Sequence, residues 1–567
     1  MFRKNTSHLQ GSLFGIASQL PEAKLEKLKT SKEYDFYRLI FCKIKEEDFA
    51  VLYSDACSRP NAPVNALVSS ILLMQSNTWT VEQLFDRIDF DLLVRTALGL
   101  DTLDQTLFCP ATFYNFQNRM LDHFLKTGVN LLESVFDHLT QEQLKILKIK
   151  TDIQRSDSFL AMSNIRSYSR IQLLVEVLIR LHRILSDEDK KHFQEAMKPY
   201  VNQSSSQYVY ALKRSDMPHA LDTLGQVYHR LYEALKDTYS NVEVFGIFQR
   251  VYTEHFTVVE EKVQVKPPEE LSSGSLQSPD DVDATYRTKR GESSKGQSIN
   301  VTETANPDNE LNLINDVAVC PNNTDDSMIL NQRLDRIKEK TPDLNEMHTD
   351  GAYGSEANDQ KMEQLDVTHV QTAVRGRKPA VKMAIEQTSE DQYTVSCPNQ
   401  CVDSQQTSKR YKACFDASIC EQCPHSKKCP AKVQKQGRVY YFDRSDYLLY
   451  QRSKNIELLP AERRTLRPNV EATVKEFTKS FNHKGKLKVR GLFKTMLYAY
   501  GMAISINFGR IHRYLAKNSD LSTLLCSIGG LLCRLIGKNR RFRFIGFRLW
   551  PNRRSSAGWH MNLKQAA

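Results

Sequence analysis

Short runs with strand-like alternation lie among much longer helical tracts, and this mixture decides the fold class of the chain. The segment at 144–165, LKILKIKTDIQRSDSFLAMSNI, changes from helical spacing of its apolar residues to alternation. Further strand-like runs follow in GQSINVTET, LNLINDVAVCPNN, LNEMHT and VTHVQTAV. A helical pattern, DDSMILNQRLDRIKEK, begins at Asp325 or Asp326, either of which can cap it. Strands interspersed with helices in this way predict an α/β fold.

Two helical tracts interrupt these strands. The first covers about 34–130, where NALVSSILLMQ and VEQLFDRIDFDLLVRTALGL repeat apolar residues every three or four positions. The second begins at Arg170 and is predicted to remain helical to about Val263. No stretch reaches the roughly 18 uninterrupted apolar residues of a membrane span, and the N-terminus lacks the apolar centre of a signal peptide. We therefore expect a cytoplasmic protein whose cysteines are thiols or metal ligands.

Positive charge is concentrated at the C-terminal end. The whole chain carries a net charge of +11, but residues 477–567 contain 18 Lys or Arg and one acid, Asp520. Aromatic residues alternate with the bases there, as in KNRRFRFIGFRLWPNRR. Such a segment is typical of a surface that binds a polyanion, because each neutralised phosphate releases condensed counterions. The alternative is a solvated basic tail.

Three acids stand out from their surroundings. Asp157 lies within a strand-like run, Asp350 ends another run directly before Gly351, and Glu471 lies beside the apolar stripe of a helical segment, four residues before Lys475. Singly, they read as an edge-strand acid, a turn residue and half of a surface ion pair. Together they predict a site for Mg²⁺ or Mn²⁺, in which two ions could act on a phosphodiester.

Cysteines cluster in a separate segment. The spacing Cys420-x2-Cys423-x5-Cys429 is preceded by Cys397, Cys401 and Cys414 and contains His425. A close Cys-x2-Cys pair is a usual part of a tetrahedral zinc site, which predicts structural Zn²⁺ held by Cys397, Cys420, Cys423 and Cys429. Zinc would stabilise a segment that is poor in apolar residues. The alternative is a set of reduced thiols.

The acidic motifs also resemble a known family. DSFLAMSN, HTDGAYGSEAN and LRPNVEATVKEF are similar to the three acidic motifs of bacterial insertion-sequence transposases with a DDE, RNase H-like catalytic core, in the group with a Tyr-Arg-Glu-Lys signature. CSRPNAPVNALVSSILLMQ and RGLFKTMLYAYGMAISINFGRI resemble that group's N-terminal domain and C-terminal helix. The chain departs from the signature at two positions, where Arg464 replaces the tyrosine and Thr478 replaces the lysine. Asp152 is a rival for the first acid, but the spacing from Asp157 to Asn164 matches the motif.

The resemblance implies a long variant of this family with a cysteine-rich insert. Its catalytic and metal-binding triad would be Asp157, Asp350 and Glu471, with two Mg²⁺ or Mn²⁺ ions. Candidate DNA contacts are Arg467, Lys475, Lys479, Arg287, Lys488 and Arg490. The implied parts are an N-terminal segment (1–33), a helical N-terminal domain for DNA-end recognition (34–140), a mixed-sheet RNase H-like core (141–169, 264–379 and 446–517), a helical insertion (170–263), a zinc-binding insert (380–445) and a basic tail (518–567).

The implied function is DNA transposition, with metal-dependent cleavage at the ends of an element and strand transfer to target DNA. The partner would be double-stranded DNA carrying terminal inverted repeats. Because both ends are handled together, at least a homodimer on DNA is implied, in the bacterial cytoplasm. Two other functions stay open: an inactive, domesticated DNA-binding protein, and a metal-dependent nuclease without strand transfer.

Overall fold

The computed structural model describes residues 1–9, 15–54, 59–260, 262–289, 291–371, 381–389, 391–434, 437–461, 463, 466–482 and 484–518. Arg464 and nearly all of the predicted basic tail lie outside these ranges. The chain divides into two compact units, Met1–His512 and Arg513–Ala567. All the predicted site residues lie in the first unit. Among the described residues, no helix has both the length and the hydrophobicity of a membrane span.

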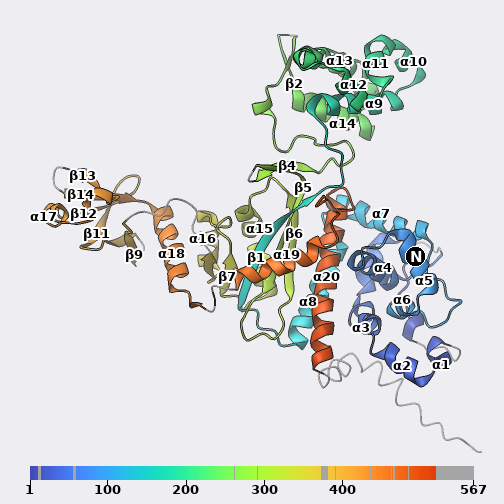
Figure 1. Cartoon of the computed structure of the whole chain (residues 1–567), viewed down its shortest axis with the longest axis horizontal. Helices are drawn as coiled ribbons and strands as arrows, with labels where there is room; N and C mark the ends of the chain where they lie inside the picture. The colour runs from blue at the N-terminus through green and yellow to red at the C-terminus, as the bar shows by residue number, and fades with distance from the viewer. Residues whose placement is uncertain are drawn as a thin grey trace, which may run out of the picture. The chain divides into compact units, whose positions relative to one another are not determined.

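A mixed sheet forms the centre of the first unit (Figure 1). Its strands are ordered β4-β5-β1-β7-β8, and β6 also pairs with β5. β1 is antiparallel to β5 and parallel to β7, which is parallel to β8. This arrangement confirms an α/β core and is compatible with an RNase H-like one. The strands are β1 (Ile153–Met162), β4 (Thr285–Lys289), β5 (Glu292–Thr304), β6 (Ile314–Pro321), β7 (Glu346–Thr349) and β8 (Thr368–Gln371).

Helices cover both faces of this sheet. On one face, α15 (Asp326–Lys340) and α16 (Glu356–Gln364) form a hydrophobic cluster with Met347 of β7. Leu330 and Leu334 of α15 are completely buried there, and each such burial contributes about 1.5–3 kcal/mol. On the other face, Ala161 of β1 and Val301 of β5 join a cluster with α20 (Leu492–Lys517) and the N-terminal helices. Strand alternation divides the side chains of β1 between these two layers.

The N-terminal part is helical, as its spacing predicted. α4 is almost wholly buried, which agrees with its nearly continuous apolar sequence. α8 also contacts β6, and the predicted domain boundary at residue 140 falls inside this helix. The helices are α1 (Ile16–Gln19), α2 (Glu22–Lys29), α3 (Lys32–Leu39), α4 (Val64–Ser76), α5 (Val81–Phe90), α6 (Leu92–Ala97), α7 (Pro110–Thr127) and α8 (Leu131–Ile146).

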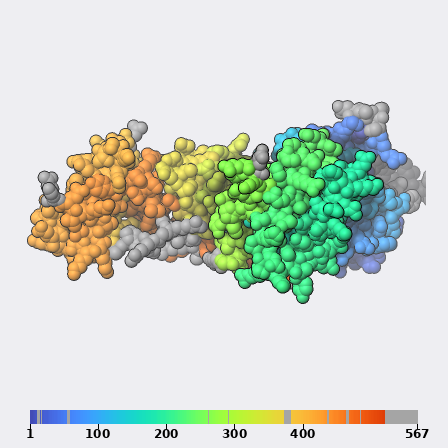
Figure 2. Space-filling view, turned by 90° about the horizontal axis from the view of Figure 1, so that it is seen from above, coloured from blue at the N-terminus to red at the C-terminus, as the bar shows by residue number. Residues whose placement is uncertain are grey.

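The helical insertion has a hydrophobic core of its own, and Figure 2 shows its side chains (green) packed into one continuous body. Its helices are α9 (Arg170–Ile184), α10 (Asp187–His192), α11 (Gln194–Val201), α12 (Ser205–Ala211), α13 (Met217–Tyr239) and α14 (Glu243–His255). The prediction of helix to about Val263 is wrong, because β2 (Phe256–Val259) and β3 (Lys262–Val265) form an antiparallel pair. The β-branched residues in FTVV and KVQV favour strands over helix.

The cysteine-rich segment folds around an antiparallel sheet ordered β13-β14-β12-β11-β10-β9. Its strands and short helix are β9 (Ala384–Ser389), β10 (Gln392–Ser396), β11 (Cys401–Gln406), β12 (Tyr411–Phe415), α17 (Ala417–Glu421), β13 (Lys432–Gln434) and β14 (Gly437–Phe442). Tyr393, Val395, Phe415 and Phe442 form the centre of a hydrophobic cluster. The segment is poor in apolar residues, as the sequence indicated, but alternation places those few on one face, where they form this cluster.

Candidate active site

Asp157 lies in the middle of β1, on the face that the C-terminal helices cover. Alternation places it with Arg155 and Phe159, and the Phe159 ring packs against Phe477 at a centroid distance of 5.5 Å. The rival acid, Asp152, lies before the strand, where its carboxylate accepts hydrogen bonds from Asn306 Nδ2 at 2.7 and 3.0 Å. Of these two acids, only Asp157 is directed toward the other members of the predicted triad.

Asp350 directly follows β7, the parallel neighbour of β1. The pairing of Arg155 with His348, continued by two residues, brings Asp350 beside Asp157. One oxygen of its carboxylate, Oδ1, accepts a hydrogen bond from the Ala352 amide at 2.7 Å. Asp350 thus forms the turn that its Asp-Gly sequence indicates. Its other oxygen, Oδ2, remains directed toward Asp157 and Arg467.

Glu471 completes the group from a separate helix. It is the second residue of α19 (Val470–Thr478), which is held against β1 by the buried side chains of Val470 and Phe477. Lys475 shares the helix with Glu471, but the ion pair recorded for Glu471 is with Arg467, at 3.0 Å. The structure therefore brings two strand acids and one helix acid to the same place.

The Arg467 guanidinium lies between the three acids. Its Nη2 is 2.8 Å from Asp157 Oδ2 and 3.9 Å from Asp350 Oδ2, while its Nη1 is 3.0 Å from Glu471 Oε1. Exposure rises across the group, with side chains 12% exposed for Asp157, 33% for Asp350 and 60% for Glu471. Burial raises the pKa of Asp157, and the Arg467 charge opposes that rise. The positive charge of Arg467 thus offsets the repulsion among the three carboxylates.

These carboxylates are the type of donor that fits the metal ions of the predicted function. Mg²⁺ and Mn²⁺ prefer oxygen ligands, and three carboxylates around one cationic group supply them. The described residues contain no group of three or more His, Cys, Asp or Glu side chains already arranged to hold a metal ion. In this structure the three acids converge on the guanidinium.

A buried ionic network fixes α19 against the sheet, and no local sequence signal pointed to it. The completely buried Glu303 of β5 contacts Arg155 Nη2 at 2.6 Å and Arg510 Nη1 at 2.7 Å. Thr473, on α19, donates a hydrogen bond to Glu303 Oε2 at 2.8 Å. Arg155 also donates to the Leu466 carbonyl at 2.8 Å, close to Arg467 in the chain. The network therefore positions both Arg467 and Glu471.

A second polar network supports the aspartates from the opposite face. Ser158 donates a hydrogen bond to Asp326 Oδ1 at 2.6 Å, so this acid bonds to β1 while Asp325 occupies the cap position of α15. Tyr353, three residues after Asp350, is completely buried and donates to Asn300 Oδ1 at 2.6 Å. These bonds tie the turn at Asp350 to β5 through a side chain with little freedom.

Apart from Arg467, which pairs with the acids, the predicted DNA contacts fall into two groups. Lys475 and Lys479 are exposed on and just after α19. Arg287 instead donates to the carbonyls of Asn322 and Thr324. Lys488 donates to the Thr78 carbonyl at 2.8 Å, and Arg490 donates to the Asn164 carbonyl at 2.7 Å. The two lysines near the triad therefore have more freedom to meet a phosphate than these three residues do.

The four predicted zinc ligands line one small pocket of about 20 Å³, together with His425. Asn399 Nδ2 lies 3.1 Å from Cys423 Sγ, and Gln400 Nε2 lies 3.4 Å from Cys420 Sγ, as hydrogen bonds to sulfur. The described cysteines are free of disulfides. Cys401 and Cys414 do not line this pocket, although the sequence placed them in the same cluster.

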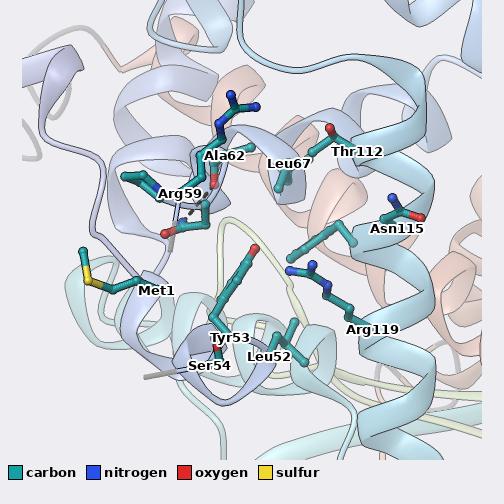
Figure 3. A pocket seen from close by; sticks show the side chains of 13 residues that line it. Met1, Leu52, Tyr53, Ser54, Arg59, Ala62, Leu67, Thr112, Asn115 and Arg119 are labelled. Atoms are coloured by element: carbon teal, nitrogen blue, oxygen red, sulfur yellow. Dashed lines mark hydrogen bonds between the residues drawn. The ribbon is translucent and has the colours of Figure 1, made fainter. Parts of the chain in front are cut away.

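The N-terminal helices contain a cavity of about 460 Å³ (Figure 3). Arg59 and Arg119 line it, and the Arg119 guanidinium lies 5.2 Å from the centre of the Tyr53 ring. None of the three acids lines this cavity. It is a feature of the domain predicted to recognise DNA ends, distinct from the acidic group.

Comparison with known proteins supports the motif around Glu471, the only one of the three acidic motifs that it covers. Residues 390–512 match the protein family described as the transposase DDE domain. This segment begins in the cysteine-rich sheet, includes α19 with Glu471 and ends within α20. Searches of the curated proteins and of the solved structures gave no match. The predicted resemblance to DDE transposases is therefore confirmed by a family match over the part of the chain that contains the third acid.

Proposed function

We propose that this chain is a transposase that cleaves DNA at the ends of an insertion element and joins those ends to target DNA. The observation that supports this most is the convergence of Asp157, Asp350 and Glu471 on one guanidinium, 2.8, 3.9 and 3.0 Å away. Acids separated by more than a hundred residues come together over the neighbouring strands β1 and β7, in the interior of a mixed sheet. The family match adds the expectation that the substrate is DNA.

Asp157, Asp350 and Glu471 would hold the divalent ions. When bound, Mg²⁺ or Mn²⁺ supplies charge stabilisation for an in-line displacement at phosphorus and lowers the pKa of the attacking water or hydroxyl. The chain's own groups set the geometry: Glu303 and Thr473 hold α19, and Tyr353 holds the turn after β7. Arg467, Lys475 and Lys479 would offset the phosphate charge that builds in the transition state.

Double-stranded DNA is the proposed partner, with the N-terminal helices reading the element ends. Arg59 and Arg119 support this assignment, because both line an open cavity in that domain. Two ends must be joined together, so we propose that the active form on DNA is a homodimer or larger, in the bacterial cytoplasm. An inactive DNA-binding protein is the less favoured alternative, because the structure retains all three acids in one place. A nuclease without strand transfer would use the same site.

The test is cleavage and strand transfer on a labelled duplex carrying the element's own end, with Mg²⁺, Mn²⁺ or EDTA. Asp350→Asn keeps the shape of the turn but removes the charge, and we expect both reactions to vanish. Asp343→Asn is the matched control, because Asp343 is exposed in the loop before β7. Equal activity in wild type and Asp350→Asn would refute the triad. Cutting without joining would favour the nuclease, and tight binding without either reaction would favour the DNA-binding protein.

We propose that the cysteine-rich insert binds a structural Zn²⁺ through Cys397, Cys420, Cys423 and Cys429. The support is a pocket of about 20 Å³ that all four line, with two amide groups directed at its sulfurs. Metal analysis of the purified chain should find one zinc ion, which Cys423→Ser removes. Cys401→Ser should retain the zinc, because Cys401 does not line the pocket. If the purified chain is incubated with Zn²⁺ and still retains none, the proposed zinc site is refuted.

A further inference from the structure

Arg467 forms an unusual centre for three ion pairs. Its side chain is 16% exposed, and within the described part of the chain its Nε is buried without a hydrogen-bond partner. Two of its three carboxylate partners are themselves accessible, and the contact with Asp350 is long, at 3.9 Å. A buried donor without an acceptor costs free energy, so this guanidinium is incompletely satisfied even though it donates to Asp157 and Glu471.

The structural arginines nearby are held differently. Arg155 and Arg510 pair with Glu303, whose side chain is 0% exposed, and both also donate to other acceptors. Arg467 instead has one well-buried partner, Asp157, and a partner, Glu471, that is 60% exposed. Ion pairs with exposed groups contribute little and are screened by salt. Another cation can therefore replace Arg467 at lower cost than it could replace Arg155 or Arg510.

Arg467 also lines a cavity. This cavity of about 350 Å³ is lined by Arg467 together with Arg463 and Gln371. Arg463 pairs with Glu346 at 2.6 Å, which leaves its own charge already matched. A phosphate that entered this cavity would meet Arg467, and the one acid in its lining, Glu457, is paired with Lys382 at 2.6 Å. The Arg467 side chain thus borders both the acidic group and a space large enough for a phosphate.

We propose that Arg467 is a placeholder cation, which keeps the three acids together before the divalent ions bind and is released to the DNA phosphate when they do. This inference rests on the proposed function, because it takes the three acids as the metal site. Arg467 is then a positioning residue in the metal-free protein and a phosphate contact in the loaded one. Metal and arginine compete for the same carboxylates, so each weakens the hold of the other.

The test is Mn²⁺ binding to the full chain without DNA, measured from the electron paramagnetic resonance signal of free Mn²⁺. Arg467→Gln should bind Mn²⁺ about tenfold more tightly than wild type. A neighbouring opposite charge changes the affinity of a carboxylate for a cation by about this factor, since it shifts a carboxyl pKa by about one unit or more. Arg463→Gln is the matched control from the same segment, with its carboxylate partner outside the triad, and should stay within about twofold. Asp157→Asn should lose the tight site.

Thermal unfolding gives a second readout that a purely structural arginine would not produce. Without metal, Arg467→Gln should unfold at a lower temperature than wild type, because three acids then repel one another. At saturating Mn²⁺ the two proteins should unfold at the same temperature. Unchanged or weaker Mn²⁺ binding in Arg467→Gln, with binding still lost in Asp157→Asn, would overturn the placeholder and leave the metal site standing. If Asp157→Asn binds Mn²⁺ as tightly as wild type, both the placeholder role of Arg467 and the metal site at the three acids are overturned.

Discussion

The single carboxylate of Glu303 holds two arginines and α19, which makes Glu303→Gln the most informative substitution in the core. The change keeps the size of the side chain but removes the charge opposite Arg155 and Arg510, at 2.6 and 2.7 Å. Removing one partner of a buried ion pair costs about 3–5 kcal/mol, because the remaining charge stays buried and unmatched. Glu476→Gln is the control, since Glu476 pairs with the same Arg510 at 3.3 Å but is 28% exposed. Its expected cost is below about 1 kcal/mol.

Hydrogen exchange followed by mass spectrometry measures this locally, without requiring a chain of several domains to unfold in one step. In Glu303→Gln, amides of β1, β5 and α19 should exchange about a hundredfold faster, the equivalent of roughly 3 kcal/mol. Amides of the helical insertion, which has its own core, should be unchanged. Equal exchange in the two variants would refute the assignment of α19's position to Glu303.

The network also predicts a pH dependence. Burial alone would raise the pKa of Glu303, but Arg510 and Arg155 outweigh it and the pKa is lowered. A lowered carboxyl pKa stabilises the fold above the ordinary pKa of a glutamate, and this stability is lost as pH falls through the lowered value. Glu303→Gln should lack that part of the acid sensitivity.

Three further predictions concern other parts of the chain. Burial lowers the pKa of His255 to about 4, so the helical insertion should lose roughly 3 kcal/mol between pH 6.5 and pH 4, and His255→Gln should abolish that slope in circular dichroism melts. Gly296→Ala should cost about 1–3 kcal/mol or more in chemical denaturation, because Gly296 has φ +152° and an added Cβ would lie 2.3 Å from the Ala161 carbonyl oxygen. Lys475→Gln should reduce the slope of log DNA affinity against log salt by about 0.9, whereas Lys236→Gln, in the helical insertion, should leave it unchanged.

Local patterns were sufficient to predict β1, β5, β6, β7 and β8 of the central sheet, although not β4. Asp157 and Asp350 each lie within or directly after a run whose alternation is visible over a few residues, and the parallel pairing of β1 with β7 then brings them together. Asp350 also shows that forming a turn does not keep a carboxylate away from the other acids, because Oδ1 accepts the bond of the turn while Oδ2 faces Arg467. The helix of Glu471 was predicted from its apolar stripe, of which Val470 and Phe477 are buried and Val474 and Phe481 are partly buried.

Long-range contacts were beyond the reach of the sequence. Glu303 reads as an ordinary polar residue of a strand, and its partners Arg155 and Arg510 are 148 and 207 residues away. Arg467 was predicted as a phosphate contact, but its pairing with Asp157 spans 310 residues. The hairpin at 256–265 was missed because a few β-branched residues at the end of a long helical tract carry a weak signal. The sheet of the cysteine-rich segment was missed for a similar reason, since its strands are short and its sequence is mostly polar.

The place where the cysteine-rich segment leaves the core has a consequence for how such chains can vary. The segment follows β8, and after it α18 (Arg444–Leu458) returns to β8, where Asn455 Nδ2 donates to the His369 carbonyl at 3.2 Å. The cysteine-rich segment therefore begins and ends next to the same strand, β8. The number of residues between Asp350 and Glu471 then has no bearing on the distance between their carboxylates. We expect this position to tolerate exchange of the whole segment for a short loop or for an unrelated domain, while the acids keep their arrangement.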